Sequence, residues 1–352
     1  MLTEILAQYR LKPEAVIQPF GNGLINFTWR VSEGGKNYIL QKINDKVFKE
    51  PLNIAFNIQQ LSGYLKHAHR EYFFVTPVLT ENGESVVKIN NEYYRLFPFV
   101  KNSTSYDVAK TPEHAFEAAR QFGMFTKMLT AFEPHSLKIT LQDFHNLPLR
   151  FLQFEYACKH GNQHRVAESK RETGFLEGHS DIVSEYNNIT RSPGFKLRVT
   201  HHDTKISNLL FDEHGKGICV IDLDTVMPGY FISDVGDMMR TYLSPVSEEE
   251  NDFTQIEIRE EFFKAIVDGY LQQMVKELSN EEIRHFVYSG MFMIYMQALR
   301  FLTDHLNNDA YYGAAYEGQN LIRAKNQIIL LQKLMEKEDR LHQLVMQLAG
   351  IL

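Results

Sequence analysis

The segment VTHHDTKISNLLFDEHGKGICVIDLDTVMPG, residues 199–229, places many polar side chains in and beside short apolar runs. Its notable groups are two adjacent histidines, three carboxylates and one amide: His201, His202, Asp203, Asn208, Asp222 and Asp224. Burying a carboxylate without a partner is costly, so a packed core gains nothing from this collection of groups. The segment therefore indicates chemistry rather than packing.

Asp203 and Asn208 have the spacing of a kinase catalytic loop, in which four residues separate an aspartate from an asparagine. Phosphoryl transfer requires an acceptor hydroxyl held in line with the γ-phosphate and a metal ion that compensates the developing charge. We expect Asp203 to accept or orient the hydroxyl proton. Asn208 and Asp222, which ends a predicted strand, are expected to bind Mg²⁺, because this ion prefers oxygen ligands.

Other interpretations of the segment were weighed against this one. An isolated D-x-x-x-x-N is common by chance, and it gains meaning here from the preceding histidine and the strand that follows. His201 and His202 do not by themselves make a zinc site, which needs three or four ligands, so we expect one of them to brace the loop. For Asp224 three roles stay open: metal binding, substrate binding and capping of local backbone.

Composition limits the class of protein. The chain has 352 residues, more than one compact core usually holds, which favours two domains or a two-lobed unit. Its 44% hydrophobic and 23% charged residues are typical of a globular protein, and a net charge of −7 gives no reason to expect binding to nucleic acid. Its two cysteines, Cys158 and Cys219, exclude a disulfide framework and a cysteine-based metal site, and fit a reducing compartment.

Residues 1–15, MLTEILAQYRLKPEA, have the pattern of a short amphipathic helix. They lack the basic start, apolar centre and cleavage site of a signal peptide. No apolar run in the sequence approaches the roughly 20 residues that span a bilayer. We therefore expect a cytoplasmic protein without a membrane partner.

The first hundred residues predict a small antiparallel sheet that carries one helix. Asn82-Gly83 is the strongest turn signal in the second half of this region. The expected elements are strands at 15–20, 27–33 and 38–44, a helix at 50–68, and a strand–turn–strand unit at 74–100.

Long helical patterns dominate from Pro112 onward. Residues 112–132 and 260–278 have the pattern of amphipathic helices, whereas residues 285–306 are apolar almost all round and predict a buried helix. A small sheet lobe joined to a larger helical lobe is the layout of a nucleotide-dependent kinase. The expected fold class is therefore α+β, with a nucleotide-binding lobe at 1–100, a hinge at about 96–103, and a catalytic and acceptor-binding lobe at 104–352.

The motif THHDTKISNLLFD followed by VIDLDTVMPG resembles the aminoglycoside phosphotransferase and choline kinase superfamily, and more closely the N-acetylhexosamine 1-kinases. The similarity extends to FGNGLINFTWRV, YILQKINDKVFKEP, SDVGDMMR and LRFLTDHLNNDAYY, and so covers nearly the whole chain. The resemblance implies a protein-kinase-like bilobal fold with ATP and Mg²⁺. It also implies transfer of the γ-phosphoryl group to the anomeric hydroxyl of N-acetylglucosamine or N-acetylgalactosamine.

The predicted phosphate-binding turn is GNGLIN, a G-x-G-x-x-N rather than the three-glycine loop of a kinase. Gly21 and Gly23 would let backbone N–H groups approach the nucleotide phosphates closely. Asn26 is expected to support the turn. The hinge is expected near residues 93–100, whose backbone would hydrogen-bond the adenine edge, as the resemblance implies.

The third predicted strand departs from the kinase pattern. Strand alternation places Gln41 where a kinase has its phosphate-binding lysine, and Lys42 follows it. Adjacent strand residues face opposite sides of a sheet, so only one of the two points toward a nucleotide. We expect a local bulge to present Lys42 to the phosphates. Otherwise Mg²⁺ and other groups do its work, and Lys42 is a solvent-facing charge on an exposed sheet.

Arg300 and Tyr311 match positions that look like acceptor contacts in the N-acetylhexosamine kinase family. A second interpretation of Arg300 is an ion pair with Asp304, its i,i+4 neighbour on a helix. The resemblance gives Asp234, in SDVGD, the role of bracing the catalytic loop through its backbone.

Three functions compete at this stage. The leading one is a sugar 1-kinase, and the second is a kinase for choline, homoserine or an aminoglycoside, whose cationic members call for an acid-lined pocket. The third is an inactive kinase-fold binding protein, which the retained Asp203, Asn208 and Asp222 argue against. A protein kinase is disfavoured, because DLDT replaces D-F-G and no A-P-E follows.

Overall fold

The computed structural model describes residues 2–21 and 25–351, which form two compact units assembled from separate stretches of sequence. Unit 1 comprises Met1–Ser105, Met128–Gln142 and Asn208–Pro228. Unit 2 comprises Tyr106–Lys127, Asp143–Ser207 and Gly229–Leu352. An antiparallel sheet forms the N-terminal part and helices dominate the C-terminal part, so the predicted α+β, protein-kinase-like class is confirmed.

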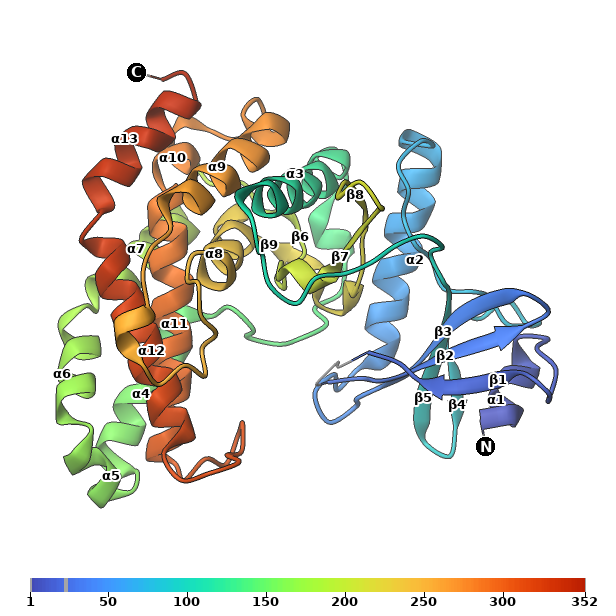
Figure 1. The fold of residues 1–352 in the computed structure, drawn as a ribbon, viewed down its shortest axis with the longest axis horizontal. Coiled ribbons are helices and arrows are strands. Elements are labelled where there is room, and N and C mark those ends of the chain that lie inside the picture. The colour runs from blue at the N-terminus through green and yellow to red at the C-terminus, as the bar shows by residue number, and fades with distance from the viewer. Residues whose placement is uncertain (1, 22–24, 352) are drawn as a thin grey trace. The chain divides into compact units, whose positions relative to one another are not determined.

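Unit 1 is built on a five-stranded antiparallel sheet in the order β1-β2-β3-β5-β4 (Figure 1). One face carries apolar residues such as Val31, Leu40 and Leu96, which pack against helix α1. Alternation along the strands places Gln41 and Arg95, together with apolar residues such as Ile39 and Phe97, on the other face. The strands are β1 Val16–Pro19, β2 Phe27–Glu33, β3 Lys36–Ile43, β4 Val87–Ile89 and β5 Glu92–Pro98, and α1 is Leu2–Gln8.

The hairpin between β4 and β5 turns at Asn90 and Asn91, whose φ angles are 53° and 62°. Two successive left-handed residues give a turn whose twist matches that of the strands. Asn82-Gly83 also forms a turn, with φ of 80° at Gly83, but residues 74–80 before it form no strand. The predicted position of the hairpin turn was therefore wrong, because an Asn-Asn pair is a weaker turn signal than Asn-Gly.

Helix α2, Pro51–Ala68, fastens the sheet region to the later segments of unit 1. Proline at its first turn has the φ a helix needs and lacks only an N–H that would have no helical partner. Asn57 is fully buried in α2, and its amide donates to the backbone oxygens of Lys138 at 2.8 Å and Val226 at 3.0 Å. Its side-chain oxygen accepts from the backbone N–H of Lys138 at 2.8 Å. A buried amide with all these partners is a strong local tie.

A short antiparallel hairpin, β7 Leu209–Phe211 with β8 Gly217–Val220, follows the catalytic-loop motif in unit 1. Thr104 exchanges two backbone hydrogen bonds with Phe211, at 2.9 and 2.8 Å. The strand was predicted to run to Asp222 but ends at Val220, because Asp222 has a left-handed backbone with φ of 58°. The 3-10 turn η3, Leu223–Thr225, comes next.

Unit 2 is organised around α11, Phe286–Leu306, which packs against α12, α8 and α4 (Figure 1). Nearly all its side chains are buried, as its apolar sequence predicted. The predicted helices at 112–132 and 260–278 are α3 Pro112–Met128 and α9 Glu260–Met274. The remaining helices are α4 Leu147–His160, α5 Gln163–Glu168, α6 Lys170–Gly178, α7 Asp181–Arg191, α8 Phe231–Tyr242, α10 Asn280–Arg284, α12 Gln319–Met335 and α13 Glu338–Leu348.

Helix α8 approaches the backbone of α11 closely at Gly236. A Cβ atom there would lie 2.3 Å from the backbone oxygen of Ser289, so a larger residue would force the helices apart. This contact fixes the height and rotation of α8, which carries Asp234. Unit 2 also contains strand β6, Arg198–Thr200, immediately before the catalytic loop. None of the helices in the described ranges is both long and apolar enough to cross a membrane.

Candidate functional site

The loop that follows β6 in unit 2 is fastened to α8 through its backbone. The Asp234 carboxylate accepts hydrogen bonds from the backbone N–H groups of His202 at 2.7 Å and His201 at 3.0 Å. One turn later, Asp237 accepts from the backbone N–H of Thr204 at 2.8 Å. Burial raises the pKa of Asp234 to about 7, and the two N–H bonds act in the opposite direction. The bracing role predicted for Asp234 is confirmed by these bonds.

Both histidines of the loop are buried and have structural surroundings. The His201 ring lies edge-on to Phe122, with centroids 5.3 Å apart. His202 has a left-handed φ of 67°, and its ring lies so close to Gly229 that a Cβ there would be 2.4 Å from Nε2. The histidines therefore brace the loop, as predicted for one of them.

Asp203 carries the accessible carboxylate of this loop. Its side chain is 25% exposed, and the Lys205 ammonium lies 2.9 Å from its Oδ2 atom. Its backbone N–H donates to Nδ1 of His201 at 3.3 Å. A carboxylate on a rigid backbone and open to solvent has the surroundings that a proton acceptor needs.

Asn208 and Asp222 lie at the same end of the β7–β8 hairpin in unit 1. Leu209 pairs with Val220, and the backbone N–H of Ile221 donates to the backbone oxygen of Asn208 at 2.9 Å. Among the described residues, no three His, Cys, Asp or Glu side chains are grouped to hold a metal ion. One amide and one carboxylate nevertheless fit Mg²⁺, which takes its remaining oxygens from phosphates and water.

Asp224 belongs to a buried polar network in unit 1. Its Oδ2 atom accepts a hydrogen bond from the Asn26 amide at 2.8 Å, and its Oδ1 atom lies 2.5 Å from Nη1 of Arg95. The Arg95 Nε–H donates to Oε1 of Gln41 at 3.0 Å. The Arg95 and Asp224 side chains are only 2% and 4% exposed, so this is a desolvated ion pair. Arg95 was not singled out from the sequence.

The structure places Gln41, not Lys42, on the sheet face that carries Arg95. Strand β3 pairs with β2 and β5 in continuous register, without the bulge that would have turned Lys42 around. Lys42 lies on the same face of β3 as Leu40, where it forms an ion pair with Glu92. The pKa of Glu92 is lowered by the hydrogen bond from Lys42. The local bulge that was expected to present Lys42 is therefore absent from β3.

The predicted glycine turn is described in part. Gly21 has φ of 76°, a conformation that glycine adopts without strain. Gly23 lies outside the described residues. The side-chain oxygen of Asn26, the last residue of the turn, accepts a hydrogen bond from the backbone N–H of Asn44 at 3.0 Å.

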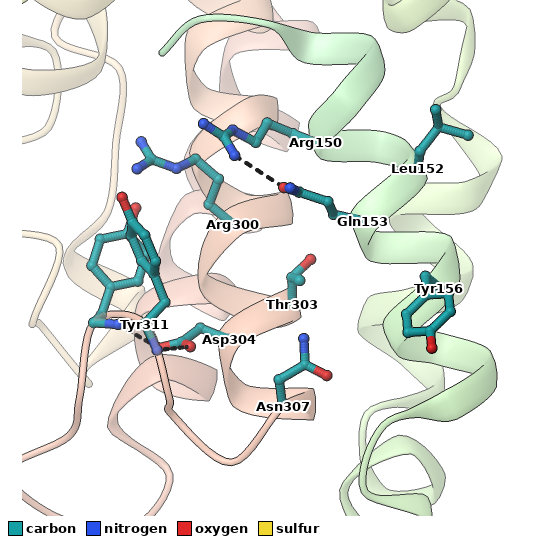
Figure 2. Close-up of a pocket in the computed structure, with 10 residues that line it drawn as sticks. Arg150, Leu152, Gln153, Tyr156, Arg300, Thr303, Asp304, Asn307 and Tyr311 are labelled. Atoms are coloured by element: carbon teal, nitrogen blue, oxygen red, sulfur yellow. Dashed lines mark hydrogen bonds between the residues drawn. The ribbon is translucent and has the colours of Figure 1, made fainter. Parts of the chain in front are cut away.

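Unit 2 contains a pocket of about 450 Å³ formed by α4, α11 and the loop after α11 (Figure 2). It brings together Arg300 and Tyr311, which were predicted, with Arg150 from α4, which was not. Figure 2 shows both arginine side chains reaching toward the same side of the pocket, above the Tyr311 ring. The full lining is Arg150, Leu152, Gln153, Tyr156, Arg300, Thr303, Asp304, Asn307, Tyr311 and Tyr312.

The alternative ion pair between Arg300 and Asp304 does not form. The Asp304 carboxylate accepts instead from the backbone N–H groups of Tyr311 at 2.7 Å and Tyr312 at 2.9 Å. Arg300 donates to Gln297 at 3.2 Å, and its guanidinium carbon lies 5.3 Å from the Tyr312 ring centroid. Within residues 25–351, no carboxylate forms a salt bridge with Arg300.

Arg150 also reaches the pocket without a carboxylate partner among the described side chains. It donates to Oε1 of Gln153 at 3.0 Å and to the backbone oxygen of Asp143 at 2.7 Å. Its pKa is lowered by burial and then by the charge of Arg300. The pocket is therefore positively charged where Arg150 and Arg300 line it. Arg150 belongs to α4, a helix far from α11 in the sequence.

Phe144 and His145 connect this pocket with the catalytic loop inside unit 2. The guanidinium carbon of Arg300 lies 6.0 Å from the Phe144 ring centroid, and the His145 ring lies 5.2 Å from the His202 ring. The pKa of His145 is lowered well below its usual value by burial, then by His202 and Arg300, so its ring is neutral. A continuous series of packed side chains therefore runs from Arg300 in the pocket to His202, the residue before Asp203.

Comparison with known proteins places the chain in a family of phosphotransferases. The sequence model described as "Phosphotransferase enzyme family" matches residues 16–277. A microcompartment-associated aminopropanol kinase has a similar structure, with TM-score 0.69, 15% identity, and coverage of 97% of this chain and 98% of that one. An aminoglycoside phosphotransferase from Alicyclobacillus acidocaldarius has TM-score 0.63 and 15% identity, with coverage of 97% of this chain and 96% of that one. A choline kinase from Cryptosporidium parvum has TM-score 0.57 and 14% identity, with coverage of 96% of this chain and 97% of that one. At such identities the likeness concerns the fold.

Proposed function

Because the chain belongs to the phosphotransferase enzyme family, we propose that it is an ATP-dependent kinase whose acceptor is a sugar. The acceptor we propose is N-acetylglucosamine or N-acetylgalactosamine, phosphorylated on its anomeric hydroxyl. Residues 1–100 would serve as the nucleotide lobe and residues 104–352 as the catalytic and acceptor lobe.

Asp203 receives the proton in the proposed reaction. The anomeric oxygen bonds to the γ-phosphorus while the bond from that phosphorus to the β,γ-bridging oxygen breaks, and ADP leaves. The hydroxyl proton passes to the Asp203 carboxylate, which is accessible and held on a braced backbone. Asn208 and Asp222 would hold Mg²⁺, which compensates negative charge on the phosphates when bound.

Three residues of unit 1 would serve the nucleotide. The backbone of Gly21 and Gly23 would face the phosphates, and Asn26 would hold the end of this turn. Asn26 is already bonded to Asp224 and to the backbone of Asn44. Asp224 would serve substrate binding indirectly, by holding Asn26 and Arg95, which both contact its carboxylate.

The observation that carries the choice of acceptor is the charge of the pocket in unit 2. Arg150 and Arg300 line it, and its carboxylate, Asp304, is taken up by two backbone N–H groups and the Asn320 amide. Two guanidinium groups repel a cation and donate hydrogen bonds to hydroxyl and acyl oxygens. This arrangement supports a neutral, oxygen-rich acceptor over choline or an aminoglycoside.

The test measures ADP release with Mg²⁺ and ATP across a panel of acceptors. The panel contains N-acetylglucosamine, N-acetylgalactosamine, the methyl glycoside of N-acetylglucosamine, choline, homoserine and an aminoglycoside. We expect turnover with the two free sugars and none with the methyl glycoside, whose anomeric hydroxyl is blocked. Preferred turnover of choline or the aminoglycoside would overturn the sugar assignment, and no turnover with any acceptor would favour a binding protein.

A further inference from the structure

The positive charge that a kinase places on its third strand is missing from the corresponding face of this sheet. In kinases that lysine pairs with a glutamate on the following helix and with the nucleotide phosphates. Here Lys42 lies on the same face of the strand as Leu40 and pairs with Glu92. The helix that follows the strand, Pro51–Ala68, contains no aspartate or glutamate at all. Neither half of the usual charge pair is therefore in its usual place.

A different cation lies on the opposite face of the sheet. Arg95 lies on β5 directly across from Gln41, in the register that pairs β3 with β5. Gln41 accepts a hydrogen bond from the Arg95 Nε–H at 3.0 Å and donates to Thr28 at 3.4 Å. The glutamine at the lysine position thus holds an arginine from the next strand.

The Arg95 guanidinium is anchored on two sides, which fixes where its charge lies. Besides Gln41, its Nη1 atom contacts Asp224 at 2.5 Å. A charge this deeply buried is costly unless it is paired, so breaking the pair would leave an uncompensated carboxylate in the interior. The pair therefore sets the position of both residues within unit 1.

Asp224 lies at the centre of a short chain of contacts that reaches two proposed nucleotide ligands. It belongs to η3, Leu223–Thr225, and Asp222 precedes this turn in a left-handed conformation. The Oδ2 atom of Asp224 accepts a hydrogen bond from the amide of Asn26, at the end of the glycine turn. One carboxylate thus links the phosphate-binding turn to the backbone that presents the metal-binding aspartate.

We propose that Arg95, held by Gln41, replaces the strand lysine as the cation that organises the triphosphate and metal site of unit 1. It is a positioning residue: it fixes Asp224, and through Asp224 both Asn26 and the backbone of Asp222. This inference rests on the proposed kinase function and adds a residue that the usual lysine motif does not identify.

The experiment separates stability from nucleotide binding with a double substitution. Arg95→Met leaves Asp224 buried and unpaired, whereas Arg95→Met with Asp224→Asn removes both charges at similar volume. We expect the double variant to recover most of the melting temperature lost by the single one. We also expect its affinity for ATP with Mg²⁺ to stay about tenfold or more below that of the native chain, as for partners that orient metal ligands.

Direct calorimetric titration with ATP, ADP and adenosine, each with Mg²⁺, provides the readout without turnover. Loss of affinity confined to ATP and ADP supports the inference, because the affected site is the phosphate end. Native ATP affinity in the stable double variant would overturn it and leave the pair a structural contact. Lys42→Met is the matched substitution on the other face of the sheet, and a loss of ATP affinity there equal to that of the double variant would also overturn it.

Failure of this inference differs from failure of the proposed function. If the native chain binds no nucleotide, the kinase proposal itself fails, whatever Arg95 does. If the native chain binds ATP and only the role of Arg95 is refuted, the kinase proposal stands. Arg95→Lys keeps the charge but loses the Nε–H bond to Gln41. Its affinity for ATP should therefore lie between that of the native chain and that of the double variant.

Discussion

Asp203 and Asp234 are two carboxylates with different surroundings and therefore different roles. Asp234 is bonded to the backbone of His201 and His202, which directly precede Asp203. Asp203 is 25% exposed, whereas Asp234 is fully buried and burial raises its pKa to about 7. The exposed group can meet a substrate proton, and the buried one accepts backbone N–H groups and holds the loop in place.

Replacing Asp203 tests the proton-acceptor role. Asp203→Asn should lower kcat by about 10²- to 10⁴-fold, since an amide cannot accept the hydroxyl proton. The affinity for ATP should stay within about twofold, because the change leaves the nucleotide contacts intact. Steady-state kinetics and calorimetry check the two parts, and near-normal turnover would remove Asp203 from the mechanism.

Replacing Arg150 tests the acceptor pocket. Arg150→Met should raise the KM for N-acetylglucosamine about tenfold, the size expected for one hydrogen bond from a charged donor. The KM for ATP should not change. Lys159→Met is the matched control, since it removes a cation from the same helix but outside the pocket lining. An unchanged sugar KM in Arg150→Met would show that the acceptor binds elsewhere.

At the scale of elements, the sequence predicted most where periodicity is strong. Helix α2 was expected at 50–68 because its apolar side chains recur with helical spacing, and α11 at 285–306 because its sequence is apolar almost all round. Strand alternation also predicted that Gln41 and Lys42 lie on opposite faces of β3, as the register shows. The β4–β5 turn was misplaced, because the choice between two Asn-containing turns depends on which flanking residues join the sheet.

The pocket and the Arg95 network could be predicted only in part. Arg150 lies on α4 and Arg300 on α11, and nothing in either helix pattern indicates that the two side chains share a pocket. Arg95 looks like any charged residue in a strand until the register sets it opposite Gln41. Such sites depend on contacts between distant segments, which spacing along one segment does not encode.

The attachment of α8 to the loop predicts a pH dependence of stability. Asp234 has a pKa raised by burial to about 7, so the folded state binds its proton more tightly than the unfolded state. This contribution therefore favours folding at low pH and is lost as pH rises from about 4 to about 7, with a slope of at most about 1.4 kcal/mol per pH unit.

Asp234→Asn should remove that slope from the free energy of unfolding, because asparagine does not titrate. Chemical denaturation of both proteins between pH 4 and pH 8 measures the difference. A matched pH dependence in the two proteins would mean that Asp234 is not protonated in the folded state across this range. The variant should also be less stable overall, since one amide hydrogen would oppose a backbone N–H group.

At the scale of the whole molecule, the compact units do not follow the order of the chain. The boundary between them passes through the catalytic motif, between Ser207 and Asn208, so unit 1 contains Asn208 and Asp222 while unit 2 contains Asp203. The proposed nucleotide and metal ligands thus belong to one unit, and the proposed proton acceptor and acceptor pocket belong to the other. Binding of each substrate can therefore be tested separately.

Nucleotide binding should stabilise the protein in a metal-dependent way. A ligand at a hundred times its Kd stabilises the folded state by about 2.7 kcal/mol, so ATP with Mg²⁺ should raise the melting temperature clearly. Chelation of the metal should reduce that rise, and Asp222→Asn should abolish the difference. Asp268→Asn, an exposed aspartate on α9, is the matched control and should behave as the native chain. An unaltered metal effect in Asp222→Asn would exclude this ligand.

The identity of the phosphorylated product tests the central claim most directly. Native protein is incubated with ATP, Mg²⁺ and N-acetylglucosamine, and the product is examined by phosphorus–proton NMR. We expect ADP and a sugar phosphate whose phosphorus couples to the anomeric proton, with no such product from Asp203→Asn. Phosphate on another hydroxyl, or ATP hydrolysis without a phosphorylated sugar, would contradict it.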